Sequence, residues 1–358
     1  MNKINTTGIS LLLGAAALTL SIHPSQAQTI KMTAVAGHPV IFPWVKLADE
    51  FFIPELDKRL AAANSKVKFE WTRAWGGTAV KLGSESGAIK DGLAELAFVS
   101  TIFEAPKFPL QNVSYVAPFM TDDVAVMSKV IKNMQAKIPA MNDAWSKNNM
   151  HFLGGTGLDS YHLFTKTPIN SLADLNGKKI NAPGPSANWV KNTGAVAVAG
   201  TLQTYYNDIQ TGVTEGALTF TTGAFPAKLV EVAPHITKVN YGAQFAGALV
   251  MSKRVYDKLP NDAKKIVDEV GAEYDARFAA TLAATATTLM QKMVEAGAKP
   301  RELSAEERKQ WAAVLPNVAL PWAKDLDAKG LPGSLVLNEF VAQMRAAGAS
   351  FPRDWSKE

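Results

Sequence analysis

Apolar residues in the first hundred positions alternate between strand spacing and helix spacing. Residues 29–35 and 67–71 alternate as strands do, and residues 93–99 form a short apolar run typical of a buried parallel strand. Between them, the apolar positions of residues 44–62 and 82–92 recur at helical spacing. Strand, helix, strand, helix and strand in this order predict an α/β domain with a mainly parallel sheet.

The loops that follow these three strands are the expected place for a ligand. In sheets of this kind, ligands bind beyond the carboxyl ends of the strands. The loops begin near Gly37, Trp75 and Ser100. We therefore expect these loops to face a binding cleft.

Residues 165–216 contain a second series of strand, turn and helix signals, which indicates a second half-domain. Residues 178–181 are predicted to form a strand that Pro183 ends, and Ser186 supplies a hydroxyl for the start of a helix. A strand that ends at a helix N-terminus leaves free backbone N–H groups. Such groups can hold a polar or anionic part of a ligand.

Residues 261–298 contain no proline and carry apolar residues at helical spacing, which predicts one long helix. At a rise of 1.5 Å per residue, an unbroken helix of this length is a rod of roughly 55 Å. By itself, the pattern is equally consistent with an ordinary packing helix or a coiled coil.

The first 27 residues have the pattern of a secretory signal peptide. Lys3 precedes an apolar stretch at residues 9–22, and Ser25-Gln26-Ala27 is a small-x-small cleavage site. The stretch is shorter than the roughly 20 apolar residues of a membrane-spanning helix. We expect an exported chain that is cleaved after Ala27.

Composition narrows the class of protein further. The remaining chain of about 330 residues exceeds the usual size of one compact core, which favours two domains. The chain has no cysteine, so thiol nucleophiles, thiolate metal sites and disulfides are excluded. Its formal net charge of +5 comes from scattered lysines and arginines. This pattern indicates mild attraction for anions, and no nucleic-acid-binding surface.

Candidate catalytic and cofactor motifs are weak. The run Asp159-Ser160-Tyr161-His162 has the residue types of a hydrolase, but no Gly-x-Ser-x-Gly pattern surrounds the serine. The glycine cluster at residues 154–157 lacks the full dinucleotide-binding pattern, and the histidines have no metal-ligand spacing. We expect a binding protein without catalytic residues, metal or cofactor.

Several segments resemble the solute-binding subunits of TRAP (tripartite ATP-independent periplasmic) transporters. The segments PINSLADLNGKKINAP and YYNDIQTGVTEG resemble the family's signature, and WGGTAVKLGSESGAIKDGLAELAFVS before them and LVMSKRVYDKLPNDAKKIVDEV after them occur in the family's order. The resemblance extends over nearly the whole mature chain. It implies a periplasmic α/β protein with two lobes, mainly parallel sheets, hinge strands and a long helix that spans both lobes. It also implies a membrane permease pair as the partner.

The order of elements and the resemblance together predict the domain boundaries. Lobe I is expected to comprise residues 28–151 and about 241–280. Lobe II is expected to comprise residues 152–240 and about 281–358. The two crossings between the lobes are expected to act as hinges near Phe152 and Tyr241.

The chain departs from the family pattern where the ligand is usually held. The resemblance implies a ligand carboxylate bound by an arginine at the position of Asn181, and many members have another arginine where Tyr161 stands. Thr219 likewise occupies a position that is often asparagine. The usual anion clamp is therefore absent.

Three interpretations of this absence remain open. The ligand is still a carboxylate, held by Arg73, by the side chains of Asn181 and Tyr161, and by backbone N–H groups near Ser186. Alternatively the ligand is a neutral polar solute. An arginine in the pocket would then be buried without an anionic partner, which is costly, so its replacement by Asn181 and Tyr161 would be expected. The third interpretation is a binder with little affinity, and a secreted enzyme on the same scaffold is an alternative of another class.

Aromatic residues in the predicted cleft segments favour a flat or apolar ligand body. The preferred ligand is therefore an organic acid, namely an aromatic or otherwise bulky monocarboxylate. The predicted ligand-binding residues are Arg73, Trp75, Ser100, Tyr161, Asn181, Pro183, Tyr206, Thr219, Phe220 and Tyr241.

Overall fold

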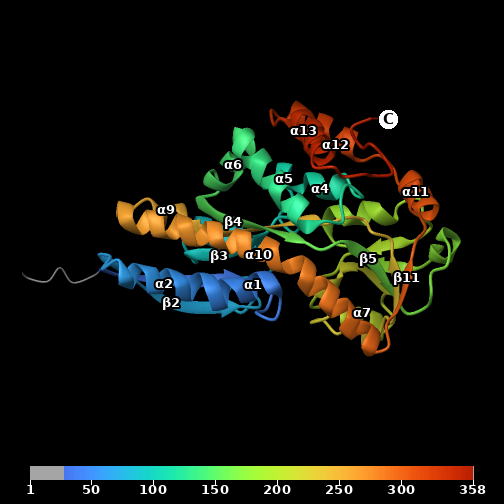
Figure 1. Ribbon diagram of the computed structural model, residues 1–358, viewed down its shortest axis with the longest axis horizontal. Coiled ribbons are helices and arrows are strands. Elements are labelled where there is room, and N and C mark those ends of the chain that lie inside the picture. Colours follow the sequence, from blue (N-terminus) through green and yellow to red (C-terminus); the bar gives the residue numbers. More distant parts are fainter. Residues whose placement is uncertain (1–27, 358) are drawn as a thin grey trace, which may run out of the picture.

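The computed structural model describes residues 28–357, so the predicted signal peptide and its cleavage site lie outside the described residues. The chain forms two lobes, and each lobe is built on one mixed sheet that is covered by helices (Figure 1). The fold is the two-lobed α/β arrangement that was predicted.

The sheet of the first lobe has five strands in the order β2-β1-β3-β10-β4. Strand β1 is parallel to both β2 and β3, as the N-terminal pattern predicts, whereas β10 is antiparallel to both of its neighbours. The strands are β1 (Gln28–Ala36), β2 (Val67–Trp75), β3 (Leu96–Ser100), β4 (Met150–Leu158) and β10 (Gln244–Ser252).

The sheet of the second lobe has six strands in the order β11-β9-β5-β8-β6-β7. Strand β6 is parallel to β7 and β8, and β5 is antiparallel to β8 and β9. The strands are β5 (Tyr161–Thr165), β6 (Lys179–Asn181), β7 (Val196–Val198), β8 (Gly216–Phe220), β9 (His235–Lys238) and β11 (Lys299–Glu302).

The chain crosses between the sheets at two short extended segments. The first crossing is Asp159–Ser160, between β4 and β5, and the second is residues 239–243, between β9 and β10. Tyr241 lies in the second crossing as predicted. Phe152 does not lie at the first, because it is inside β4, which pairs with β10 from Met150 to Leu158. The first lobe therefore extends to Leu158 and not to residue 151.

Along the chain, helices of the first lobe follow β1 and β2, where the sequence pattern predicts them. Residues 43–62 form an almost continuous helical run, namely α1 (Pro43–Leu47), a π-helical turn (Ala48–Phe52) and α2 (Ile53–Ala62). The other α-helices of this lobe before the long helix are α3 (Glu85–Asp91), α4 (Val113–Val116), α5 (Val124–Lys137), α6 (Pro139–Ser146) and α9 (Lys253–Tyr256).

The second lobe has shorter helices, α7 (Tyr205–Gln210) and α8 (Thr221–Ala224). The α-helix expected near Ser186 is instead a short 3₁₀ helix over Gly184–Val190. Gly184 has a φ of +51°, outside the right-handed helical region, so a regular α-helix does not begin there. Pro183 and Pro185 beside it supply no N–H group, so fewer free N–H groups are present than were expected.

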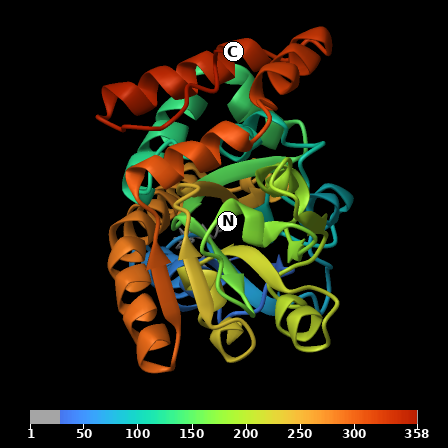
Figure 2. The same cartoon turned by 90° about the vertical axis from the view of Figure 1, so that its right-hand side faces the viewer.

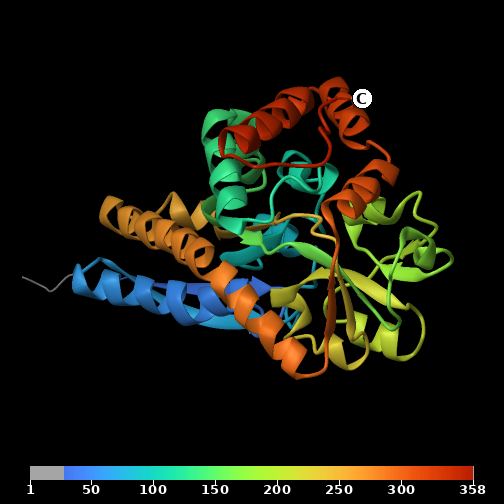
Figure 3. The same ribbon diagram turned by 45° about the vertical axis from the view of Figure 1, so that its right-hand side comes forward.

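The long helix α10 (Asn261–Glu295) forms as predicted and connects the lobes (Figure 3). Its first half packs on β4 and α2 of the first lobe, and its second half packs on α8 of the second lobe. The hydroxyl of Tyr274 donates to the carbonyl of Trp44 at 2.9 Å, so the middle of α10 is tied to the start of α1. None of the helices in residues 28–357 is long and apolar enough to cross a membrane.

The C-terminal helices correct the predicted boundary of the second lobe. They are α11 (Ala305–Val314), α12 (Ala319–Ala328) and α13 (Gly333–Ala346). Helices α12 and α13 pack on α4 and α5 of the first lobe, above the layer that α4, α5 and α6 form (Figures 1 and 2). The indole N–H of Trp355 also donates to the carbonyl of Pro118. Residues 319–357 therefore belong to the first lobe, although they follow a strand of the second.

Candidate functional site

A small, partly open cavity lies between the two sheets. About 30 Å³ of it is open to the centre of a water molecule. The first lobe contributes His38, Trp44, Ser100, Ile102, Phe103, Tyr115, Leu158 and Ala246. The second contributes Tyr161, Pro183, Leu202, Tyr205, Leu218, Thr219 and Phe220. Because β1, β3 and β8 all end beside the cavity, it occupies the position expected for a ligand in this class of sheet.

Aromatic rings from both lobes form the walls of the cavity. The rings of Trp44 and Phe220 lie 6.0 Å apart between centroids, so the lobes touch through them. Tyr161 packs on Phe220 at 4.9 Å, and its hydroxyl is 3.4 Å from that of Tyr115. Walls of this kind suit a flat or apolar ligand body.

Two buried polar atoms in these walls have no hydrogen-bond partner within the protein. They are Nε1 of Trp44 and Oγ1 of Thr219, and their side chains belong to opposite lobes. A buried polar group without a partner costs about 1–3 kcal/mol. Such atoms are therefore available to a bound ligand.

No lysine or arginine occurs among the described residues that line the cavity. His38 is uncharged at neutral pH, because burial lowers its pKa to about 3. Within residues 28–357, no group of three or more His, Asp and Glu side chains is placed to hold a metal ion. The cavity is thus lined by neutral groups.

The lobes also contact each other around the cavity. Nε2 of Gln203 donates to the carbonyl of Gly37 at 2.8 Å, and the indole N–H of Trp189 donates to the carbonyl of Tyr115 at 2.8 Å. A Cβ atom built on Gly184 would lie 2.8 Å from the carbonyl oxygen of Ile102. These contacts define a closed arrangement of the two lobes.

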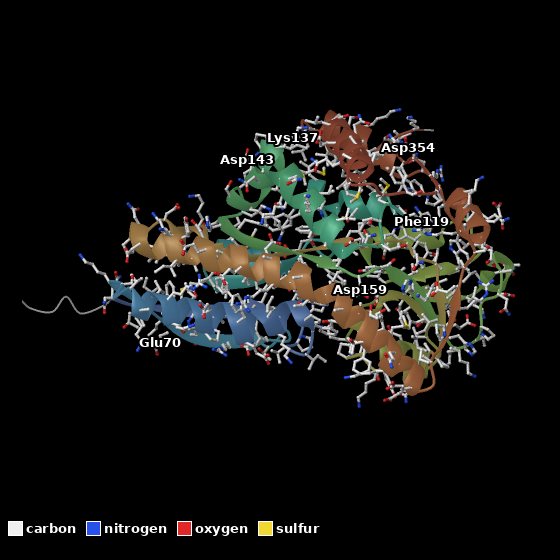
Figure 4. The ribbon with its side chains drawn as sticks, in the orientation of Figure 1. Glu70, Phe119, Lys137, Asp143, Asp159 and Asp354 are labelled. Carbon is white, nitrogen blue, oxygen red and sulfur yellow. The ribbon has the colours of Figure 1, made fainter. Side chains whose placement is uncertain are left out.

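Asp159 lies in the first crossing, where the lobes meet beside α10 (Figure 4). Its carboxylate accepts from the backbone N–H of Thr221 at 2.8 Å and from the hydroxyl of Thr222 at 2.6 Å. Asp159 thereby joins the crossing to the start of α8. Burial raises the pKa of Asp159 to about 6, although these hydrogen bonds oppose the shift.

This raised pKa predicts a pH dependence of stability. The folded protein holds the proton of Asp159 more tightly than the unfolded chain does. The resulting stabilisation is fully present below the ordinary pKa of 3.8 and is lost as the pH rises through about 6. It amounts to about 3 kcal/mol. Asp159→Asn is expected to remove this contribution, as urea unfolding between these two pH values would measure.

Asp143→Asn is the matched control, because Asp143 is an exposed carboxylate on α6. Its unfolding free energy should follow the wild-type pH dependence. Equal pH slopes for the Asp159→Asn variant and the wild type would contradict the assignment. Burial also raises the pKa of Glu85, to about 7. Because Glu85 is present in both the wild type and the Asp159→Asn variant, the difference between their pH dependences reports on Asp159 alone.

Five of the predicted ligand-binding residues line the cavity, namely Ser100, Tyr161, Pro183, Thr219 and Phe220. Ser100, Thr219 and Phe220 lie at the ends of β3 and β8, Tyr161 begins β5, and Pro183 follows β6. The structure does not bring the other five to it. Arg73 and Trp75 both hydrogen-bond to Asp49, at 3.1 Å and 2.7 Å, because they lie on the edge strand β2.

The remaining three predicted residues have partners elsewhere in the second lobe or its linker. Nδ2 of Asn181 donates to the hydroxyl of Thr214 at 2.9 Å, and the Tyr206 hydroxyl donates to Glu231 at 3.0 Å. The ring of Tyr241 stacks on that of Trp189 at 5.2 Å. Asn181 is fully buried but is absent from the cavity lining.

Sequence reasoning missed several cavity residues, among them His38, Trp44 and Tyr115. The turn at Gly37-His38-Pro39 marks the loop, but it does not show that a helix begins beside it and turns Trp44 inward. Tyr115 lies in α4, a helix of only four residues without a readable periodicity. Tyr205 could have been predicted as a cavity residue, because it belongs to the aromatic pair of the YYNDIQ segment.

Comparisons with known proteins agree with this architecture. Residues 61–325 match the family model of the bacterial extracellular solute-binding protein, family 7 (DctP). A solute-binding protein of Sulfitobacter sp. is 28% identical over 195 residues, which cover 54% of this chain and 57% of that protein. The C4-dicarboxylate-binding periplasmic protein DctP of Vibrio cholerae is 26% identical over 263 residues, covering 70% of this chain and 75% of the relative.

Solved structures share the fold over nearly the whole described chain. A TRAP solute-binding protein from Rhodoferax ferrireducens, in complex with copurified benzoate, has a TM-score of 0.78 at 18% identity and covers 89% of this chain and 98% of its own. The Bordetella pertussis receptor DctP7 has a TM-score of 0.75 at 18% identity, covering 87% and 99%. The chain therefore belongs to the bacterial extracellular solute-binding protein family 7 and is an extracytoplasmic solute-binding subunit of a TRAP transporter.

Proposed function

We propose that this protein captures a small ring-bearing organic solute between its lobes, in the periplasm, and delivers it to a TRAP membrane permease. The observation that carries the proposal is the cavity between the sheets, to which both lobes contribute aromatic walls. A ligand that contacts both lobes favours the closed arrangement, because it binds that arrangement better than an open one.

The two crossings between the sheets would serve as hinges. Residues 159–160 and 239–243 are short, and the long helix α10 runs alongside from one lobe to the other. Opening would break the contact between Gln203 and Gly37 and expose the cavity. A few loop residues can absorb a motion of this kind.

Structural relatives support a ring-bearing ligand. Besides the benzoate complex, a marine metagenome TRAP protein is described as specific for aromatic acid ligands and was crystallised with 3-hydroxybenzoate, at a TM-score of 0.77. Other relatives are described with pyroglutamate or with β-D-galacturonate. An aromatic monocarboxylate, the ligand preferred from the sequence, is a member of this group.

The alternative of a neutral polar solute is favoured by a different observation. The cavity lining lacks a lysine or arginine, so a carboxylate would depend on hydroxyl groups and the Trp44 indole N–H. Arg73, the cation proposed from the sequence, is instead paired with Asp49. We propose a ring for the ligand in both cases, whether it is a carboxylate or a neutral solute.

Thermal-shift measurements on the mature protein test the proposal. Ring compounds such as benzoate, benzamide and pyroglutamate are expected to raise the melting temperature, because a ligand at 100 times its Kd stabilises the native state by about 2.7 kcal/mol. The acyclic compounds succinate and glycerol should have little effect. Small-angle scattering should show a more compact particle when the ligand is bound.

Phe220→Ala should weaken this stabilisation, whereas Phe351→Ala should retain it, because Phe351 packs beside Arg345 near the C-terminal helices. Stabilisation by succinate or glycerol but by no ring compound would contradict the proposal. Mass spectrometry of the recovered ligand distinguishes binding from the enzyme alternative, since a binding protein returns its ligand unchanged.

A further inference from the structure

We infer that the solute is bound as an uncharged ring compound, whose polar group is recognised by the indole N–H of Trp44 and the hydroxyl of Thr219 from opposite lobes. The inference rests on the proposed function and narrows its ligand class from organic acids and neutral solutes to neutral solutes. The chemistry that fits is a ring with a neutral carbonyl or amide substituent.

The first support is the cost of placing an anion in this cavity. A carboxylate that leaves water without a cationic partner loses several kcal/mol of hydration. The described residues of the lining include no lysine or arginine, and His38 is buried and neutral. Arg73 cannot compensate from its present place, because its guanidinium is half-exposed and bonded to Asp49.

The second support is the sign of the charges that border the cavity. The carboxylate of Asp159 accepts from Thr221, which follows the lining residue Phe220. The carboxyl group of Glu85 accepts from the N–H of Gly37 at 2.9 Å, beside the lining residue His38. Because burial raises its pKa to about 7, this group is only partly charged at neutral pH.

Neither Asp159 nor Glu85 forms a salt bridge with a described Lys, Arg or His side chain. The charge of Asp159 also contributes to the raised pKa of the Tyr161 hydroxyl, after burial and the effects of Tyr115 and Tyr205. The carboxylate of Asp159 thus lies close enough to act on a residue of the cavity wall, and Lys238 is the cation that lies with it on the outer side of the crossing. Asp159 would repel a bound anion, whereas it would not repel a neutral group.

The third support is the hydrogen-bonding capacity left in the walls. An indole N–H is a donor only, so Trp44 needs an acceptor on the ligand, while the Thr219 hydroxyl can donate or accept. Both side chains are at most 2% exposed, and neither polar atom has a partner in the protein. A neutral amide supplies a carbonyl for Trp44 and an N–H for Thr219, and it satisfies both atoms without bringing a charge.

Two isosteric pairs of probes test the inference by isothermal titration calorimetry at neutral pH. They are benzamide with benzoate, and nicotinamide with nicotinate. Within each pair the ring and the size of the substituent stay the same, and the charge changes. At least one amide is expected to bind about tenfold or more tightly than its acid, which corresponds to one or two well-placed hydrogen bonds without a buried charge.

Two conservative variants show whether the named atoms recognise the ligand. Trp44→Phe removes the N–H and keeps a ring, and Thr219→Val removes the hydroxyl and keeps the shape. Each should weaken amide binding about fivefold or more. Their controls are Trp71→Phe, whose indole donates to Asp57 outside the cavity, and Thr156→Val, whose buried hydroxyl is also unpartnered but does not line the cavity.

The possible outcomes separate this inference from the proposed function. Tighter binding of the acid in both pairs would overturn the inference and leave the ring-binding function intact. Amide binding that neither Trp44→Phe nor Thr219→Val weakens, in variants with native melting curves, would overturn the assigned contacts. Absence of binding by all four probes would overturn the ring-binding function itself, and the inference with it.

Discussion

Gly184→Val is expected to abolish high-affinity binding while both lobes stay folded. Gly184 belongs to the second lobe, and a Cβ atom there would lie 2.8 Å from the carbonyl oxygen of Ile102 in the first lobe. The side chain of Ile102 would be 3.2 Å away. Since Cβ atoms essentially never approach backbone atoms so closely, the lobes of the variant cannot close fully. The affinity should fall by about 100-fold or more, because the competent closed state is no longer accessible.

The matched control is Gly177→Val. Gly177 lies in the same lobe and also has a positive φ, of +75°, but a Cβ atom there would meet nothing within 4 Å. Both variants bear the backbone strain of a β-branched residue at positive φ, and only one obstructs closure. Calorimetry measures the affinity and small-angle scattering measures closure. Wild-type affinity in Gly184→Val would show that the closed contact is not part of ligand binding.

Gly247→Ala is expected to prevent folding of the first lobe. Gly247 lies in β10, between β3 and β4, at a bulge where the register with β4 shifts. Its φ is +144°, and a Cβ atom would lie 1.9 Å from the carbonyl oxygen of Val99. Neither strand can move away, because both are buried in the centre of the sheet. The loss of stability should exceed about 4 kcal/mol, the range of severe core defects.

Gly297→Ala separates the steric effect from the backbone effect. Gly297 has a φ of +99° in the turn after α10, and a Cβ atom there would meet nothing within 4 Å. Its replacement should cost only about 1 kcal/mol. Urea unfolding and the yield of soluble protein compare the two variants. The steric argument is wrong if Gly247→Ala loses no more stability than Gly297→Ala.

Much of the fold was predictable from local patterns. The strands at residues 29–35, 67–71 and 93–99 and the helix at residues 261–298 agree with β1, β2, β3 and α10 to within a few residues at most of their ends. Their apolar periodicity reflects which face of each element is buried, and that signal is contained in consecutive residues. The family could be recognised for the same reason, because its segments are contiguous.

The prediction was weaker where an element depends on a distant partner. The sheets were predicted as mainly parallel, but β10 and β5 each enter their sheet antiparallel to both neighbours. The C-terminal helices were placed in the second lobe, yet α12 and α13 cover the first. The direction of a strand within its sheet and the lobe on which a helix packs do not change the apolar periodicity of the element itself.

The candidate site shows the same division. Strand ends such as Ser100 and Phe220 could be predicted as cavity residues, because a strand that ends at the inner edge of its sheet must point its last residues toward the cleft. Arg73 also lies near a strand end, but β2 is an edge strand and Asp49 on the adjacent helical run takes its guanidinium. Because β2 lies at the edge of the sheet, the nearest partner of Arg73 is the carboxylate of Asp49, which lies outside the cleft.

The sequence by itself determined the α/β class, the two-lobed plan, the long connecting helix and the family, because periodicity and contiguous motifs encode them. Only the tertiary structure decided which side chains meet in the cavity. Trp44 and Thr219 lie 175 positions apart in the chain and face one space only because the two sheets close on each other. Burial, partnering and charge at the site are properties of that docking, and no local pattern contains them.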